Sequence, residues 1–323
     1  METGPEELHR EGRLSDESMQ RINRIDSVRL FSLHWEIKTV LYIGILLLSG
    51  GLSILVYENI DTIGHQIILF IIAVICSGCF VYCFKKKFPY SNAKVLSPDS
   101  FFDYILLLGC LTLITFIGYL QFQYHVFDDR YGLATFIPMV ALFFSAYYFD
   151  HVGVLAMAIT SLAAWSGIAV TPTRILQDND FNSTTIIITG VVLGSVLICA
   201  GSFSLNKKIK SHFEFSYTNS GAHLLFISSL AAIFHFNEVY IILFLVVAGI
   251  CYFFYRKAIG EKSFYYLLIA SLYFYIALSY TFISLFISAS AMGGIYLTFV
   301  YFIASAIGLL FFLIKMNKKI KTL

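Results

Sequence analysis

Few side chains in this apolar sequence could do chemistry, and the most distinctive of them are the neighbours Asp150 and His151. An acid and an imidazole side by side in a tight turn could hold and relay a proton, because imidazole changes its charge near neutral pH. The same pair is equally typical of a helix cap followed by a solvated loop residue. The sequence leaves both interpretations open.

The other ionisable residues also fall at the ends of apolar runs. Asp103 and His223 fall near the ends that we predict to be cytoplasmic, as do Asp150 and His151. A charge at the centre of a bilayer costs about 2.5–3.5 kcal/mol on insertion scales, so each of these residues invites a functional question. We interpret Asp103, Asp150, His151 and His223 as candidate polar or relay residues and the rest as interfacial caps.

Tyr266, Tyr273 and Tyr280 recur every seven residues, which places their rings on one face of a helix. Buried phenols need hydrogen-bond partners, so this face is expected to look into the bundle or into a watered cavity. Packing with satisfied hydroxyls is one interpretation, and a groove for a substrate or lipid is the other.

Signatures of metal or nucleophile chemistry are missing from the sequence, including HExxH, GxSxG and a phosphate-binding glycine loop. Cys76, Cys79 and Cys83 share a helix face, but their apolar neighbours offer no further ligand, so we interpret them as small core residues. We predict no catalytic residue, no metal and no cofactor.

The elements that position these residues must lie in lipid. Hydrophobic residues make up 58% of the 323-residue chain and charged residues only 13%, with a mean hydropathy of +0.78. A soluble domain has about 45–50% apolar and about 25% charged residues, so the charges here are too few to cover a soluble surface. The net charge of +2 gives no reason to expect a nucleic-acid partner.

Ten apolar runs approach the length of about 20 residues that a helix needs to cross the hydrocarbon core. The predicted fold is therefore an all-α, polytopic transmembrane helix bundle with about ten spans. The seventh run is short, and only two residues separate the fourth from the fifth. The runs cover residues 39–57, 67–84, 101–122, 133–149, 152–170, 185–204, 222–236, 239–255, 264–286 and 295–314.

The distribution of lysine and arginine tests this count. With the N-terminus inside and every run crossing, 20 of the 22 basic residues are cytoplasmic, and only Arg130 and Arg174 are not. If run 222–236 did not cross, the split would be 13 to 9, which the positive-inside rule disfavours. We therefore predict that this run spans and that both termini are cytoplasmic. The loop at residues 150–151 carries no basic residue, so eight spans and ten remain open.

Three regions follow from this topology: a cytoplasmic, helical N-terminal segment at 1–38, a transmembrane domain at 39–315 and a basic cytoplasmic tail at 316–323. Segment 1–38 holds eight of the twenty acidic residues and no apolar core, which excludes a cleavable signal peptide. Ser15 followed by Asp16 and Glu17 predicts a capped helix. That helix could lie on the membrane surface or dock a cytoplasmic protein partner.

Ten spans would divide into five and five, and such halves would be inverted relative to each other, as in many transporters. Gly44, Gly50 and Gly51 in the first run faintly resemble Gly190, Gly194 and Gly201 in the sixth. The alternative is that these glycines simply permit close helix packing.

Several strings resemble uncharacterised bacterial membrane proteins of domain-of-unknown-function family 2157. They are YENIDTIGH at 57–65, GYLQFQY at 118–124, AYYFDHVGV at 146–154, GIAVTP at 167–172 and IGLLFFLIKMNKK at 307–319. The resemblance runs from about Leu14 to the C-terminus. It implies a location in the bacterial inner (cytoplasmic) membrane and no particular activity, so it transfers no functional residue.

Three functions are compatible with these features. The sequence favours a non-enzymatic membrane scaffold or sensor, with the N-terminal segment or the basic cytoplasmic rim binding a partner. A transporter or flippase for a small solute or lipid is the alternative, although no charged site lies at mid-membrane. A membrane-embedded enzyme that uses Asp150 and His151 is the third.

Overall fold

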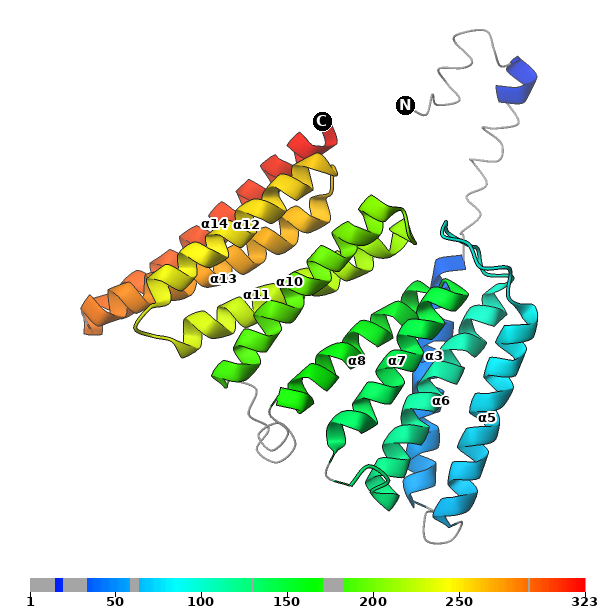
Figure 1. Cartoon of the computed structure of the whole chain (residues 1–323). Helices are drawn as coiled ribbons and strands as arrows, with labels where there is room; N and C mark the ends of the chain where they lie inside the picture. The colour runs from blue at the N-terminus through cyan, green and yellow to red at the C-terminus, as the bar shows by residue number, and fades with distance from the viewer. Residues whose placement is uncertain are drawn as a thin grey trace. The chain divides into compact units, whose positions relative to one another are not determined.

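Apolar helices joined by short loops make up most of the described chain in the computed structural model, which describes residues 15–19, 34–58, 64–128, 130–170, 183–289 and 291–322 (Figure 1). No strand occurs in these ranges, so the all-α prediction is confirmed for them. The helices are α3 (His34–Glu58), α5 (His65–Lys86), α6 (Ser100–Tyr124), α7 (Tyr131–Phe149), α8 (Val152–Val170), α10 (Thr184–Lys207), the 3-10 helix η1 (Ser211–Phe213), α11 (Glu214–His235), α12 (Tyr240–Gly260), α13 (Phe264–Ala289) and α14 (Ala291–Thr322).

Each of the ten predicted runs overlaps one of these α-helices. Within the described residues, seven helices are long and apolar enough to cross a membrane: α5, α6, α7, α10, α12, α13 and α14. α3 and α8 contribute shorter apolar stretches, Thr39–Leu52 and Val152–Gly167, and α11 does not meet the same criterion. A polytopic helical membrane protein is therefore supported, while the count of ten spans and the inverted repeat stay predictions.

The chain divides into two compact units, Met1–Thr62 and Ile63–Leu323. In the first unit, Ser15 caps a helical turn at residues 16–19, because its Oγ accepts a hydrogen bond from the Ser18 backbone N–H at 3.3 Å. The predicted continuation of this helix through residues 20–33 lies outside the described residues. The predicted boundaries at residues 38 and 315 mark where the chain enters and leaves the membrane, not where a helix ends. α3 continues across the first boundary and α14 across the second.

The second unit is built from antiparallel pairs of helices. α5 packs on α6, α7 on α8 and α10 on α11, while α12, α13 and α14 follow as a row (Figure 1). We call α5–α8 the first helix group and α10–α14 the second. The principal helix contacts between the groups run from α8 to α10 and α11.

The loops of the second unit gather at two opposite ends. At one end, which we call the junction end, Lys210 donates its backbone N–H to the Asn92 carbonyl at 2.8 Å, and Lys257 pairs with Glu214 at 2.8 Å. At the far end, hydrogen bonds join His65 with Tyr119, Thr184 with His235 and Tyr280 with Asn237. With these contacts at opposite ends, consecutive helices must alternate in direction. The predicted topology has the same alternation.

α11 is longer than the apolar run that led to it. Its 22 residues begin at Glu214, eight positions before run 222–236, so the helix is about 33 Å long at 1.5 Å per residue. The added turns are polar, but their side chains are satisfied: Glu214 accepts from Lys257 and Thr218, and Asn219 accepts from Tyr265. Hydropathy alone missed these turns because it does not register such partners.

The glycines of α10 let α11 approach very closely. A Cβ atom on Gly194 would lie 2.7 Å from the Leu225 backbone nitrogen, and one on Gly221 would lie 2.8 Å from the Gly194 carbonyl oxygen. Only glycine fits at such a contact, which is the usual role of small residues between membrane helices. For Gly190, Gly194 and Gly201, close packing is therefore the role that the structure supports.

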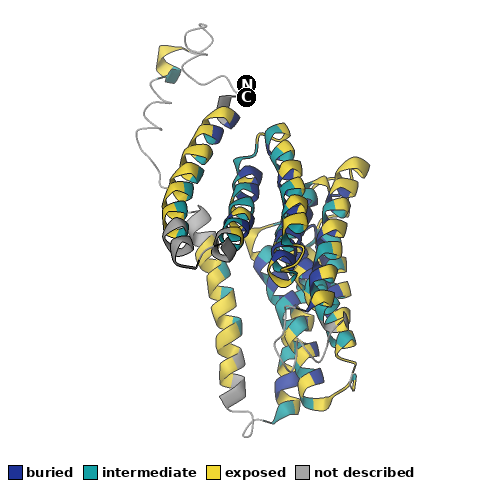
Figure 2. Ribbon diagram, turned by 90° about the vertical axis from the view of Figure 1, so that its left-hand side faces the viewer, coloured by how far each residue is buried: buried dark blue, intermediate teal, exposed yellow. Residues whose placement is uncertain are grey.

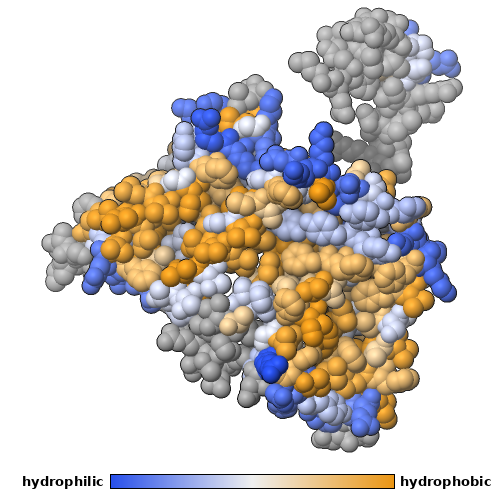
Figure 3. All heavy atoms as spheres, viewed as in Figure 1, coloured by the Kyte–Doolittle hydropathy of each residue, from blue (hydrophilic) through white to orange (hydrophobic). Residues whose placement is uncertain are grey.

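The outer surface of the helices is apolar along their length. Large side chains such as Phe70 (69% exposed) and Leu245 (64% exposed) face outwards, and exposed positions run along whole helices rather than only at their ends (Figure 2). On the face drawn in Figure 3, hydrophobic residues form a broad band with hydrophilic residues above and below it. This is the surface that a bilayer requires, because lipid rather than water solvates it.

Candidate functional site: a buried ion-pair junction

Asp150 occupies the turn between α7 and α8. It has φ 59° and ψ 44°, a left-handed conformation that Asp and Asn tolerate better than most other residues. The next N–H, that of His151, bonds the Ala146 carbonyl at 3.1 Å, which closes the last turn of α7. Two residues therefore suffice to reverse the chain, as the two-residue gap in the sequence predicts.

The Asp150 carboxylate binds three segments at once. Oδ1 lies 2.6 Å from Nε2 of His212, and Oδ2 lies 2.9 Å from Nζ of Lys210. Oδ2 also accepts the backbone N–H of Val95 at 2.5 Å. Because only 2% of the side chain is exposed, these contacts replace water almost completely. We call Asp150, Lys210 and His212 the Asp150 junction.

Lys210 is a fully buried cation held by both its backbone and its side chain. It has a left-handed φ of 49°, and the Ser204 hydroxyl donates to its carbonyl oxygen at 3.2 Å. Its Nζ also approaches the Ala93 carbonyl at 3.4 Å and lies 4.9 Å from the centre of the Tyr90 ring. Loop 87–99 and the segment after α10 therefore enclose the ammonium group, and Asp150 neutralises it.

His212 brings a second titratable group to the same carboxylate. A 2.6 Å contact is typical of a charge-assisted hydrogen bond. The other ring nitrogen, Nδ1, is buried and has no hydrogen-bond partner among the described residues. The imidazole thus sits between a strong acceptor and an apolar surrounding, so a change in its charge would act directly on the link to Asp150.

His151 faces Asp103. Its Nδ1 accepts the Val154 backbone N–H at 3.1 Å, and its Nε2 lies 3.7 Å from Oδ1 of Asp103. That oxygen is buried without a hydrogen bond among the described residues. The junction region thus holds two carboxylates, one lysine and two imidazoles.

The remaining candidate residues lie between α11 and α13. His223 bonds the Tyr273 hydroxyl at 3.0 Å, and Phe226 stacks on the Tyr273 ring with centroids 4.7 Å apart. Tyr280 donates to Asn237 at 2.8 Å, whereas the buried Tyr266 hydroxyl has no partner among the described residues. Because α11 begins at Glu214, His223 lies about 14 Å inside the helix rather than at its end.

The sequence brought Asp103, Asp150 and His151 to attention, and the structure gathers them at the junction end. The sequence pattern did not single out His212, and Lys210 was counted only as one of the cytoplasmic charges. The predicted topology contained a usable signal, because it places loops 87–99, 150–151 and 208–213 on the same side. An ion pair between Asp150 in one of these loops and Lys210 or His212 in another could therefore have been predicted.

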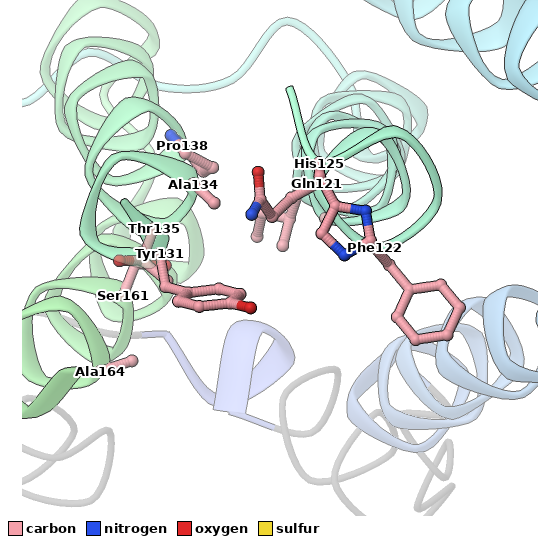
Figure 4. A pocket seen from close by; sticks show the side chains of 11 residues that line it. Gln121, Phe122, His125, Tyr131, Ala134, Thr135, Pro138, Ser161 and Ala164 are labelled. Atoms are coloured by element: carbon pink, nitrogen blue, oxygen red, sulfur yellow. The ribbon is translucent and has the colours of Figure 1, made fainter. Parts of the chain in front are cut away.

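A pocket of about 710 Å³ opens at the far end between α6, α7 and α8. Gln121 lies on its α6 wall, opposite Tyr131 and Pro138 of α7 (Figure 4). Gln121 also fixes the adjoining loop, since its side chain donates to the Asp128 carbonyl at 2.9 Å and accepts from Phe127 N–H at 3.0 Å. α7 stays helical through Pro138, although proline has no N–H to donate to the carbonyl four residues earlier.

Within the described part of the chain, no cluster of three or more His, Cys, Asp or Glu side chains could hold a metal ion. Cys76 and Cys83 are buried on α5, and Cys79 is partly buried; all three thiols are free.

Comparison with known proteins gives a family and no activity. Residues 6–155 match the family described as Predicted membrane protein (DUF2157). The resemblance read from the sequence is thereby confirmed for this part of the chain, which includes the turn at Asp150; the strings at 167–172 and 307–319 lie beyond the match. No curated protein and no solved structure matches the chain. A membrane location is supported, and the type of membrane stays a prediction.

Proposed function

We propose that this protein is a non-enzymatic membrane sensor or scaffold in which the Asp150 junction sets the relation between the two helix groups. The observation that carries the proposal is that one buried carboxylate binds a lysine and a histidine from the opposite group. The junction also lies at the end where the basic loops gather, which we predict to be cytoplasmic. A change at the junction would therefore reach the surface available to a cytoplasmic partner.

The chemistry of the junction suits a sensor of proton concentration. Imidazole is the side chain that proteins most often use as a pH sensor. His212 and Lys210 both contact the Asp150 carboxylate. His151, the next residue in the chain after Asp150, lies beside a second carboxylate, that of Asp103. Gain or loss of one proton changes the net charge of a buried cluster, and such changes bias two-state elements.

Spin labels on the two helix groups test this proposal. Labels at Lys86→Cys on α5 and Lys207→Cys on α10, both exposed, would be placed in a background without the native cysteines. We expect the distance distribution between them to differ at pH 5 and pH 8 in the otherwise unchanged protein. In His212→Gln this difference should vanish, whereas His235→Gln, the matched control at the far end of the unit, should keep it.

Identical distributions at the two pH values would overturn the sensor proposal, and so would an undiminished response in His212→Gln. A scaffold without a switch would give the first of these results. In that case, deletion of residues 1–30 should remove a co-purifying partner without loss of membrane insertion.

A transporter or flippase is the second candidate, and the far-end pocket favours it. The pocket opens at one end of the unit and the Asp150 junction lies at the other, and a carrier needs a cavity that is open to one side of the membrane. Reconstituted vesicles with a fluorescent lipid in both leaflets give the test. An impermeant quencher reaches only the lipid in the outer leaflet. If lipid from the inner leaflet becomes accessible to the quencher faster than in protein-free vesicles, the flippase proposal is supported, and equal rates would rule it out.

A further inference from the structure

The far-end pocket reaches about half way through the bundle. Its α6 wall extends to Ile114, ten residues before the end of that helix, and its α7 wall extends to Pro138, seven residues after the start. At 1.5 Å per residue these positions lie about 15 Å and about 10 Å from the far end. The hydrocarbon core is about 30 Å thick, so the pocket has the depth of one leaflet.

Polar groups gather at the mouth of the pocket, and its inner part is mainly apolar. His125 and Tyr131 stand where α6 ends and α7 begins, whereas Ile114, Gly118 and Ala164 line the walls. No Lys, Arg, Asp or Glu is among the described lining residues. A charged group would therefore find no counterion inside, but an alkyl chain would find a matching surface.

A backbone acceptor lies part of the way down the pocket. Pro138 has no N–H, so the Ala134 carbonyl loses its partner within the helix, and both residues line the pocket. The Ser161 hydroxyl lies on the α8 wall. Ala134 lies three residues after the start of α7, about 5 Å from the far end, which is close to the level of the glycerol esters of a lipid.

We infer that this pocket binds one acyl chain of a phospholipid from the leaflet at the far end, with the head group at the mouth. The depth of one leaflet, the apolar inner walls and the polar rim match the three parts of such a molecule. Its volume of about 710 Å³ falls in the range of ligand sites, about 300–1,000 Å³. The site is separate from the Asp150 junction and does not depend on the sensor proposal.

Photolabelling of the whole chain in phosphatidylcholine vesicles tests the site. The probe is a phosphatidylcholine with a diazirine near the end of one acyl chain, and adducts are mapped by mass spectrometry. We expect adducts on the pocket walls of α6, α7 and α8. Gly118→Leu should lower this labelling to the level found on the exposed face of α12, because the added side chain fills space on the pocket wall that the acyl chain would occupy.

The control is Gly249→Leu on the exposed face of α12. A Cβ on either glycine meets no atom within 4 Å, so neither substitution forces a clash, but only Gly118 lines the pocket. Gly249→Leu should leave labelling of the pocket walls unchanged. Ala164→Leu, from the opposite wall, should reproduce the loss and excludes an effect peculiar to α6.

Equal labelling in Gly118→Leu and the unchanged protein would overturn the inference. So would labelling of the pocket walls no stronger than that of the exposed face of α12, which would mean ordinary annular lipid. Disulfide-linked dimers of Gly118→Cys in place of labelling would assign the pocket to a second copy of the chain and overturn it as well.

Discussion

At the scale of single residues, Asp150 stabilises the fold only as long as its partners remain. Asp150→Asn keeps a residue that tolerates φ 59° but removes the charge that neutralises the buried Lys210. Loss of one partner from a buried pair costs about 3–5 kcal/mol. We expect Asp150→Asn and Lys210→Met each to lower the free energy of unfolding by that amount in detergent titrations.

Lys207→Met, three residues earlier and exposed, is the control and should change stability by less than about 0.5 kcal/mol. The double variant Asp150→Asn/Lys210→Met should lose less than the sum of the single variants, since it removes both members of the Asp150–Lys210 ion pair together. Additive losses would mean that the two residues do not interact.

At the scale of elements, the α10–α11 contact depends on the absence of side chains at two glycines. Gly194→Ala would place a methyl group 2.7 Å from the Leu225 backbone nitrogen, so the helices must separate. Overpacking of this kind costs about 1–3 kcal/mol. We expect a loss of this size in the free energy of unfolding, measured by denaturant titration in detergent.

Gly249→Ala tests whether glycine replacement in a helix is harmful by itself. Its Cβ meets open space, so the variant should be neutral or more stable by up to about 1 kcal/mol, because alanine favours the helix. A loss of equal size in both variants would show that the α10–α11 contact is not responsible.

At the scale of the whole molecule, the alternation of helices predicts which loops face the cytoplasm. An impermeant thiol reagent should label Val126→Cys and Glu238→Cys in spheroplasts, in which the inner membrane is intact and accessible from outside. It should label Lys94→Cys and Lys262→Cys only after the membrane is opened, because basic loops stay inside. Labelling of Lys262→Cys in intact spheroplasts would show that α11 does not cross.

Much of this architecture could be predicted from the sequence, because apolar content and charge act locally. Each of the ten runs overlaps a helix, and the two-residue gap at Asp150 and His151 is a real turn. Length and hydropathy are properties of a segment, so no neighbour is needed to recognise them. The first turns of α11 are the exception, because only Lys257 and Tyr265 make their polar side chains acceptable.

Composition and charge by themselves predicted that this chain is a membrane protein and that its helices alternate in direction. Hydropathy shows which segments are solvated by lipid, and basic residues show which loops stay on the cytoplasmic side. Only the tertiary structure decided which polar groups meet. Asp150 contacts Lys210 and His212, some 60 residues away, and its neighbour His151 reaches Asp103. Ala134 of α7 and Gly118 of α6 border one pocket only because the two helices are neighbours in the fold. Such partners are fixed by helix packing, which no local pattern encodes.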